Sequence, residues 1–507
     1  MQNEPSRVRK LLLSTGTSLL NQFVVGISGL ILPVYILQAF GSSVNGLVSS
    51  ITQFLSLISL MDMGIGAVVQ ANLYKPLAEQ DNKKLSEIVI SAERFYRTLA
   101  KLFIVYVFIL SIVYPLLQLE KYDYIFTASL VIIIAIGTFV QYYFGITYQT
   151  LLGADQKTYI YQVLQSIAVV LNLVGCIVLI KAGCSIHIVK LTTVIIYLIR
   201  PMGINLYVKK KYKIDKSVVV VGEPIRQKWN GFAQHIANVV LQNTSILVLT
   251  MFSTLENVSI YTVYYNVVRM IKELLEQTLN SLLPLLGSMY AKKENELLHK
   301  FFGVMEWGIH TIVVLLFSIT GIMITPFVVV YTSEVNDVNY NQPLFGVLIT
   351  LAIASYLLRT PYTAMVKAAG HFKQTQMSAI IEMVLNIVIS VFSVMQFGLI
   401  GVTFGIIVSM TYRSLHLAIY TYKNILHCAY RRILMRWSTD CLTVFLIVIS
   451  TKWISIEVTS YMSWFVIALC KGIISLGVVA VVNLLLCGNK VKQLTAFITK
   501  KERIGCE

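Results

Sequence analysis

Long apolar runs separated by short polar stretches dominate this chain. An apolar helix of about 20 residues crosses the hydrocarbon core of a membrane, so each run predicts one spanning helix, or two where it is longest. The uncharged runs cover residues 11–61, 102–119, 124–154, 158–180, 229–255, 307–333, 338–358 and 383–412.

Turn and charge signals divide this pattern into fourteen predicted helices. We number them as segments one to fourteen: 12–38, 46–73, 99–119, 124–151, 158–181, 185–207, 230–253, 258–290, 303–331, 343–366, 375–396, 399–422, 437–455 and 461–487. In the thirteenth segment, only 441–451 is uncharged between Asp440 and Lys452. Twelve helices with a re-entrant C-terminal hairpin are therefore the alternative.

Composition agrees with this pattern. Of the 507 residues, 56% are hydrophobic and 13% are charged, and the mean hydropathy is +0.73. Soluble domains carry roughly 25% charged residues, so a soluble domain is excluded. The sequence predicts an all-α polytopic membrane protein, and its N-terminal apolar run continues past any cleavage point, as in an uncleaved first span.

The distribution of the net charge of +17 predicts the orientation of the chain in the membrane. Most of the 41 Lys and Arg residues lie in the tails, in alternate loops or at helix ends beside those loops, for example at 209–216 and 431–436. Under the positive-inside rule both termini are cytoplasmic and the helix count is even. We expect the basic loops to contact anionic headgroups of the lipid bilayer, and we expect no nucleic-acid partner.

The chain repeats itself at a nearly constant offset. The matches are 170–174 (VLNLV) with 384–388 (VLNIV) and Asp62 with Glu276, both at 214, and Arg200 with Arg413 at 213. They align segments one to six with segments seven to twelve. Because a six-helix unit keeps its orientation, this predicts two pseudo-two-fold-related six-helix lobes plus a C-terminal helical hairpin, with a substrate site between the lobes.

The predicted domains follow from this repeat. They are an N-terminal six-helix lobe over 1–208, a basic cytoplasmic linker over 209–228, a C-terminal six-helix lobe over 229–423, and helices thirteen and fourteen with a basic cytoplasmic tail over 424–507.

Segment eight carries a charged stripe formed by Arg269, Lys272, Glu273 and Glu276. Their spacing of i, i+3, i+4 and i+7 places them on one helix face. A charge at bilayer depth costs at least about 2.5 kcal/mol, so it faces a wet cavity or a partner. Arg269 and Lys272 are candidates for binding a phosphate or pyrophosphate. The alternative is a ladder of i, i+4 ion pairs that neutralises the stripe.

Polar side chains are concentrated in segments one, two, seven and eight, whereas segment three has almost none. We expect the polar segments to line the cavity, because polar groups exposed to lipid lack partners. The substrate-binding candidates there are Asn21, Gln22, Gln53, Asn238 and Gln242. The alternative is that such side chains form hydrogen bonds between helices.

Carboxylates are the candidates for ion coupling. Asp62 and Glu276 are equivalent in the repeat, and Glu273 lies beside them. A carboxylate buried in a membrane can exchange a proton or bind sodium. For Asp62 the alternative is a helix cap or bend before Met63-Gly64-Ile65-Gly66. For Glu306, His310, Glu382, Asp440 and Lys471 we expect local pairs.

Enzyme chemistry is not expected. The sequence has no GxxxxGK[ST] loop, no HExxH motif and no metal-ligand spacing among its seven cysteines, so we predict no catalytic residue, metal or cofactor. Any work would come from a gradient, of protons or sodium, or from mass action.

Three stretches give the chain its resemblance to a known family. They are Leu57–Leu73 (LISLMDMGIGAVVQANL), Tyr148–Tyr159 (YQTLLGADQKTY) and Tyr362–Thr375 (YTAMVKAAGHFKQT). With its length and six-plus-six-plus-two layout, the chain resembles the Wzx-type lipid-linked oligosaccharide flippases of the multidrug/oligosaccharidyl-lipid/polysaccharide (MOP) superfamily.

The resemblance implies a multi-pass protein of the bacterial inner membrane that translocates an undecaprenyl-pyrophosphate-linked oligosaccharide. The glycan would be a repeat unit of an O-antigen, capsule or exopolysaccharide, and a glycan polymerase of the same pathway is a candidate partner. The implied mechanism is alternating access through a V-shaped cleft between the lobes, with proton- or sodium-driven exchange. The alternatives are a multidrug/cation antiporter of the same superfamily and a lipid II flippase. Lipid II flippases carry arginines in helices one and two, which segments one and two here lack.

Overall fold

The apolar runs of the sequence form helices. The computed structural model describes residues 7–61, 65–218, 232–280, 282–454 and 458–499, and every regular element in these ranges is a helix. Lipid offers no hydrogen-bond partner to a peptide group, and a helix satisfies its backbone groups within one segment. The all-helical fold class is confirmed.

In the first half of the chain the elements are α1 (Arg7–Ser56), the 3₁₀ turn η1 (Leu57–Leu60), α2 (Ile65–Glu79), α3 (Asn82–Leu116), α4 (Tyr124–Val140), the π-helical turn η2 (Gln141–Gly145), α5 (Ile146–Ala154), α6 (Thr158–Lys181), α7 (Ile186–Tyr197) and α8 (Ile199–Lys211).

In the second half they are α9 (Phe232–Phe252), α10 (Leu255–Asn280), α11 (Leu283–Ala291), α12 (Asn295–Tyr331), α13 (Pro343–Leu358), α14 (Thr360–Ala368), α15 (Gln376–Phe397), α16 (Leu399–Tyr420), the π-helical turn η3 (Thr421–Ile425), α17 (Arg431–Thr451) and α18 (Tyr461–Thr499).

Twelve helices of the described ranges are long and apolar enough to cross a membrane, two fewer than the fourteen predicted. One difference is that segments one and two fall in a single run, Leu13–Leu60, which kinks at Gly41 with φ 82° and ψ 171°. The other is that α10 is not among the twelve, because its charged stripe lowers its apolar character. The chain is a multi-pass membrane protein, and the fourteen-helix topology stays a prediction.

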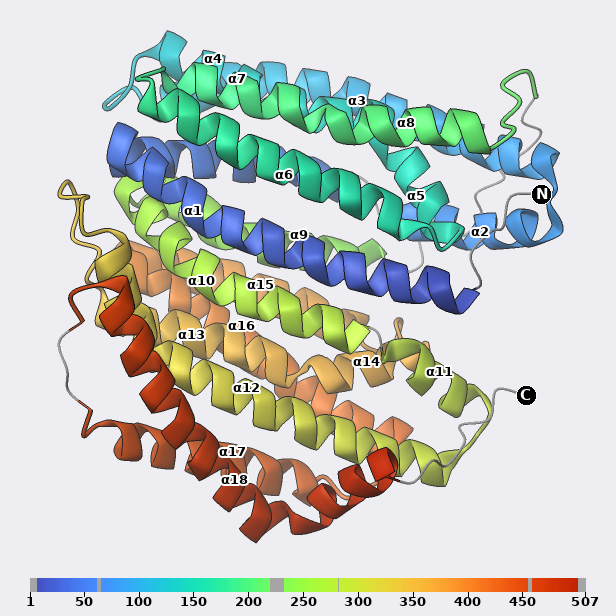
Figure 1. Cartoon of the computed structure of the whole chain (residues 1–507), viewed down its shortest axis with the longest axis vertical. Coiled ribbons are helices and arrows are strands. Elements are labelled where there is room, and N and C mark those ends of the chain that lie inside the picture. Colours follow the sequence, from blue (N-terminus) through green and yellow to red (C-terminus); the bar gives the residue numbers. More distant parts are fainter. Residues whose placement is uncertain (1–6, 62–64, 219–231, 281, 455–457, 500–507) are drawn as a thin grey trace. The chain divides into compact units, whose positions relative to one another are not determined.

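The chain divides into two compact units, residues 1–266 and 267–507, and the division falls within α10. The predicted lobe and linker boundaries at 208, 228 and 423 stay predictions. In the first unit α6 lies between α1 and α7, and α4 packs on both α3 and α7 (Figure 1). The buried side chains of α1, α3 and α4, such as Leu47, Tyr96 and Leu130, form its main apolar core.

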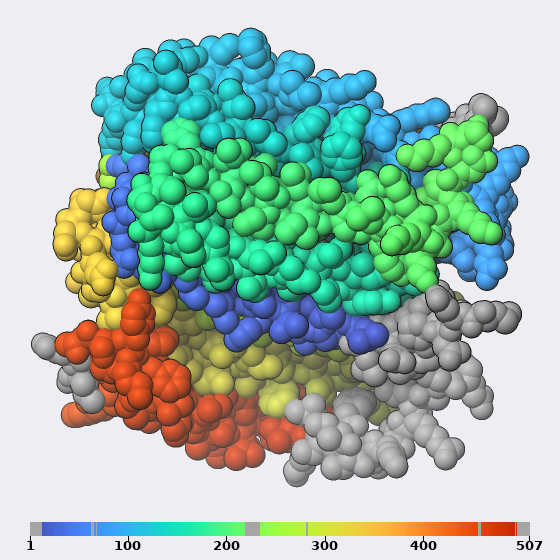
Figure 2. Space-filling view, turned by 45° about the horizontal axis from the view of Figure 1, so that its top comes forward, coloured from blue at the N-terminus to red at the C-terminus, as the bar shows by residue number. Residues whose placement is uncertain are grey.

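The outer surface of the first unit is apolar along α3. Val105 is 57% exposed and Phe108 is 65% exposed, although both are large hydrophobic side chains. Light-blue to green helices, which follow α2 in the sequence, cover the face of this unit seen in Figure 2. Lipid is the natural contact of such a surface, which agrees with the near absence of polar side chains in segment three.

The second unit is organised by two close helix packings. One is α15 with α16, which are joined by Gly398 at φ 54° and ψ −129°, a conformation that suits glycine. Gly401 and Gly405 then face α15, and a Cβ on Gly401 would lie 2.2 Å from the Ser393 carbonyl oxygen. This GxxxG spacing lets two backbones approach closely.

The other close packing is around α12, which contacts α13, α17 and α18 (Figure 1). Trp307 Nε1 of α12 donates to Asn483 Oδ1 of α18 over 2.6 Å, and Trp464 Nε1 of α18 donates to the Met323 carbonyl oxygen over 3.0 Å. The C-terminal hairpin is therefore tied to α12 by hydrogen bonds in addition to apolar contacts.

Some helix boundaries in the two halves follow the sequence repeat. Helix α5 starts and ends at the same offset from α14 that relates Asp62 to Glu276, while α3 and α12 depart from that offset by one position at each end. The helix ends therefore agree with the repeat for these two pairs, whereas α16 is continuous where the first half has both α7 and α8. This agreement supports the repeat, and the predicted two-fold relation of the lobes stays a prediction.

Candidate functional site

The polar candidates of the first unit make contacts between helices. Asn21 is buried, and its Oδ1 accepts a hydrogen bond from Ser166 Oγ of α6 over 3.1 Å. Gln53 of α1 donates to the Asn243 side chain and, over 3.3 Å, to the Gln242 carbonyl oxygen of α9. For Asn21 and Gln53 the structure thus shows the interhelical role.

The remaining predicted residues of this unit are dispersed. Gln22 is half-buried, whereas Asn238 and Gln242 are exposed on α9. Asp62 lies outside the described residues. Before it, Leu57–Leu60 forms a 3₁₀ turn. Their roles in substrate binding and coupling stay predictions.

The charged stripe of α10 has two kinds of contact in the second unit. Arg269 Nε donates to Glu273 Oε1 over 2.6 Å, which is the i, i+4 pair of the ladder alternative. Lys272 is buried, and its Nζ lies 4.4 Å from the centre of the Tyr356 ring of α13. The Tyr356 hydroxyl donates to Glu276. The stripe therefore contains the Arg269–Glu273 ion pair and a second site built around Tyr356.

Arg359 completes the site around Tyr356. It lies between α13 and α14, and its Cζ is 4.5 Å from the centre of the same ring. Arg359 also pairs with Glu382 of α15, and Arg413 Nε of α16 lies 3.6 Å from Glu382 Oε2. Two cations thus share one aromatic ring, whose quadrupole attracts both.

Positive charge exceeds negative charge in this group, which we call the Tyr356 cluster. Its ionisable members are Lys272, Arg359, Arg413, Glu276 and Glu382. Three cations against two carboxylates leave a formal charge of +1. Three cations gathered at one ring and one carboxylate can attract a further anionic group, because guanidinium and ammonium groups bind carboxylates and phosphates. The cluster can hold an anionic group in addition to its own carboxylates.

Sequence reasoning missed most of this cluster. Arg359 directly follows the uncharged run 338–358, where a basic residue is typical of a helix end. Tyr356 gave no signal, because nothing in the sequence pairs it with Glu276, which lies far earlier in the chain. The available signal was the recurrence of Arg359, Glu382 and Arg413 in three successive apolar segments, and we expected Glu382 to form only a local pair.

A second buried polar network joins α12 to α14, η3 and α17. The Glu306 carboxylate accepts hydrogen bonds from the Tyr362 and Tyr422 hydroxyls, each over 2.7 Å. His310 Nδ1 lies 2.5 Å from Asp440 Oδ2, and Arg436 Nη2 lies 3.1 Å from Asp440 Oδ1. These acids have partners on other helices, so they brace the second unit internally.

Near the start of α3, a charged side chain caps the helix. Asp81 precedes α3 and accepts a hydrogen bond from the Lys84 backbone N–H over 3.0 Å, which lowers the pKa of its carboxyl. In the described part of the chain, no group of three or more His, Cys, Asp or Glu side chains is placed to hold a metal ion.

Solved structures share this fold. The lipid II flippase MurJ in its inward closed conformation matches with a TM-score of 0.70 and 15% identity, covering 93% of this chain and 99% of that chain. An inward-facing multidrug resistance MATE family transporter of the MOP superfamily matches at 0.56 and 13%, covering 80% and 98%. The Vibrio cholerae MATE transporter VcmN in its bent form matches at 0.54 and 14%, covering 82% and 96%.

No protein-family model matches the chain, and no curated protein matches it. At these identities the likeness establishes the fold alone.

Proposed function

We propose that this protein is a flippase that moves an undecaprenyl-pyrophosphate-linked oligosaccharide from the cytoplasmic to the outer leaflet of a bacterial inner membrane by alternating access. The cargo is the repeat unit of an O-antigen, capsule or exopolysaccharide. The MOP-superfamily fold and the multi-pass helices support a transporter, and the Wzx-type resemblance of the sequence supports this cargo.

The observation that carries the proposal is the excess positive charge of the Tyr356 cluster beside the exposed Arg269. Lys272 lies one helical turn after Arg269 on α10, and Arg359 is brought to the same ring from α13. A pyrophosphate presents several anionic oxygens, which suit the fork of a guanidinium and the point charge of an ammonium. Arg269, Lys272 and Arg359 would hold this headgroup.

A lipid-linked cargo is also favoured by the extent of the structural likeness. The alignment with the lipid II flippase covers 93% of this chain, so the part left uncovered is shorter than α18 alone, which has 39 residues. The likeness therefore reaches into the C-terminal hairpin. The multidrug antiporter is the second candidate, supported by the MATE neighbours, and a cluster with excess positive charge disfavours a cationic cargo.

Energy would come from a proton or sodium gradient. The candidate coupling groups are the carboxylates of Glu276, Glu273 and Asp62. Glu276 is the best placed, because it accepts a hydrogen bond from Tyr356, whose ring also contacts the two cations. Protonation of Glu276 would raise the positive charge of the cluster and favour anion binding, which links the two events. A polymerase that accepts the flipped repeat unit is a candidate partner.

Replacing Arg269 and Lys272 by Gln tests the proposal. We expect surface glycan to fall at least about tenfold, since one hydrogen bond to a charged group contributes about 1.5 to 3 kcal/mol. The assay measures surface glycan in a host that lacks its own oligosaccharide flippase. Membrane fractions confirm that the variant is inserted. Undiminished export would reject the anion site.

The matched control replaces one Arg and one Lys of other i, i+4 pairs. Arg97→Gln with Lys300→Gln removes the pairs with Glu93 at 3.3 Å and Glu296 at 2.6 Å, both on helix surfaces. Export should stay unchanged in this variant. Complementation of a strain that lacks its lipid II flippase, without complementation of glycan export, would assign the chain to the lipid II alternative.

A further inference from the structure

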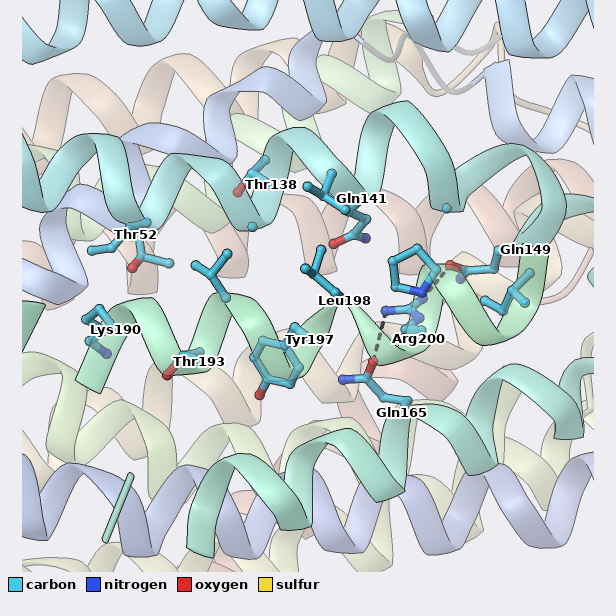
Figure 3. A pocket seen from close by; sticks show the side chains of 17 residues that line it. Thr52, Thr138, Gln141, Gln149, Gln165, Lys190, Thr193, Tyr197, Leu198 and Arg200 are labelled. Atoms are coloured by element: carbon cyan, nitrogen blue, oxygen red, sulfur yellow. Dashed lines mark hydrogen bonds between the residues drawn. The ribbon is translucent and has the colours of Figure 1, made fainter. Parts of the chain in front are cut away.

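A partly open cavity of about 350 Å³, with polar and apolar side chains in its lining, lies in the first unit among α1 and the helices from α4 to α8. Ligand pockets of proteins occupy about 300 to 1,000 Å³, so this volume is at the small end of that range. Figure 3 shows Lys190 of α7 toward one end of the cavity and Arg200 of α8 toward the other. None of the residues predicted from the sequence as substrate-binding lines it.

Arg200 is held in the cavity by neutral groups. Its Nη1 donates to Gln165 Oε1 over 3.0 Å, its Nη2 donates to Gln149, and its Cζ lies 6.0 Å from the Tyr161 ring centre. A guanidinium stays protonated in a protein, so amide partners leave its charge in place. The side chain is thus positioned without being neutralised.

The surrounding helices supply no carboxylate to balance these cations. Between residues 124 and 211, which include α4 to α8, the only acidic residue is Asp155. Asp155 already pairs with Lys157 over 2.7 Å and accepts a hydrogen bond from the Tyr212 hydroxyl over 2.5 Å. Within the described ranges, neither Lys190 nor Arg200 forms an ion pair with a carboxylate.

The second half of the chain shows what balances the equivalent arginine. Arg413, which the repeat aligns with Arg200, has Glu382 beside it, and Glu382 also pairs with Arg359. At the offset that relates Asp62 to Glu276, Glu382 corresponds to Ala168 and Arg359 corresponds to Gly145. The first half has two small residues where the second half has an ion pair, and Gly145 lines the cavity. The first half therefore has no carboxylate at the position that corresponds to Glu382.

The rest of the lining suits a polyhydroxyl compound. The amides of Gln141, Gln149 and Gln165 each offer a donor and an acceptor, and Tyr197 adds a hydroxyl and an aromatic face. Sugar hydroxyls both donate and accept hydrogen bonds. An inorganic anion needs donors only, whereas the Gln141 oxygen and the second lone pairs of the Gln149 and Gln165 oxygens can also accept, which favours an acidic sugar over phosphate or sulfate.

We propose that this cavity binds an acidic sugar, with its carboxylate on Arg200, its hydroxyls on the glutamine amides and Tyr197, and Lys190 contributing a second positive charge. The source of this sugar, a uronic acid residue of the exported glycan, rests on the proposed function. The sugar's carboxylate would take the place that Glu382 has beside Arg413 in the second half.

Glucuronate binding to the purified full-length protein in lipid nanodiscs tests the assignment. We expect calorimetric binding of glucuronate and a higher unfolding temperature in its presence, because a ligand that binds only the folded state stabilises it. Glucose and sulfate at the same concentration should do neither. Equal binding of glucose would overturn the carboxylate contact, equal binding of sulfate would overturn the sugar, and no binding of glucuronate would overturn the site.

Substitutions of lining residues test whether glucuronate binds in this cavity. Arg200→Gln should weaken glucuronate binding at least tenfold, and Lys190→Met should weaken it severalfold. Lys181→Gln is the matched control: this cation of α6 lies 5.8 Å from the Tyr35 ring and is not part of the lining, so its removal should leave binding unchanged. If Arg200→Gln does not fold, Lys190→Met and the cavity-filling Gly145→Leu provide the test. Wild-type affinity in a folded Lys190→Met or Gly145→Leu variant would overturn the assignment.

Binding and export are separate measurements. A chain that binds glucuronate through Arg200 but exports no glycan would contradict the proposed function and support the cavity assignment. A chain that exports glycan but binds no glucuronate would overturn only the cavity assignment.

Discussion

Tyr356 is the residue on which the candidate anion site depends. Its ring receives Lys272 at 4.4 Å and Arg359 at 4.5 Å, and its hydroxyl donates to Glu276. Without the ring the ammonium and guanidinium groups would lose a shared contact that offsets their repulsion. One aromatic side chain therefore holds together cations from two distant parts of the sequence.

Two substitutions of Tyr356 separate the ring from the hydroxyl. Tyr356→Phe keeps both cation–π contacts and should retain most glycan export. Tyr356→Leu removes two contacts of about 0.5 to 2 kcal/mol each and should lower export severalfold or more. Surface glycan is the measurement, with protein abundance in the membrane as the control. The idea of a ring-centred site fails if Tyr356→Leu exports like the wild type.

For individual residues, the sequence predicted ion pairs within one helix and missed contacts between helices. The Arg269–Glu273 pair follows from i, i+4 spacing on one helix, and the structure has it at 2.6 Å. The partners of Lys272 and Glu276 come from α13, where packing of two helices decides which side chains meet. Periodicity within one helix contains no information on that choice.

Helix continuity decides where the charged residues of each element lie. The sequence predicted a break between segments one and two, and the structure bends at Gly41. It predicted one helix over 258–290, and the structure has α10 and then α11, which begins next to Pro284. Pro284 suits the first turn of a helix, where no backbone N–H is needed, so the restart has a local cause. The π-helical turns η2 and η3 have no such sequence signal.

The α15–α16 pair depends on its small residues. In Gly401→Ala the new Cβ would lie 2.2 Å from a backbone oxygen of α15, so the helices must separate. We expect a loss of about 1 to 3 kcal/mol from overpacking, measured as a lower unfolding temperature of the purified protein. Gly308→Ala in α12 meets nothing within 4 Å and should be neutral or stabilising by up to about 1 kcal/mol. Equal behaviour of the two variants would contradict this account of the pair.

For the molecule as a whole, composition and apolar runs were sufficient for the fold class, because lipid forces apolar segments to be helical. The boundaries of α5 and α14 also follow the repeat. The cavity could not be predicted from the sequence, since it depends on the absence of large or charged side chains at certain positions. Gly145 and Ala168 are ordinary residues in an apolar sequence. Their small size becomes informative only by comparison with the ion pair at the aligned positions of the other half.

Orientation in the membrane follows from the loop charges and can be measured. Lys213 lies in a basic stretch predicted to be cytoplasmic, and Asp337 lies in a loop predicted to be outside. In a variant with its seven native cysteines replaced, Asp337→Cys should react with a membrane-impermeant thiol reagent in intact cells. Lys213→Cys should react only after lysis. Labelling of Lys213→Cys in intact cells would invert the predicted topology.

The ion pair of Arg359 with Glu382 also has a pharmacological consequence. In the second half a guanidinium and a carboxylate pair at the positions that the repeat aligns with Gly145 and Ala168, and Gly145 lines the cavity of the first half. A small zwitterion that copies these two groups would be a starting compound for a plug of the hollow half. The Arg359–Glu382 pair is therefore a structural template for designing an inhibitor of this protein.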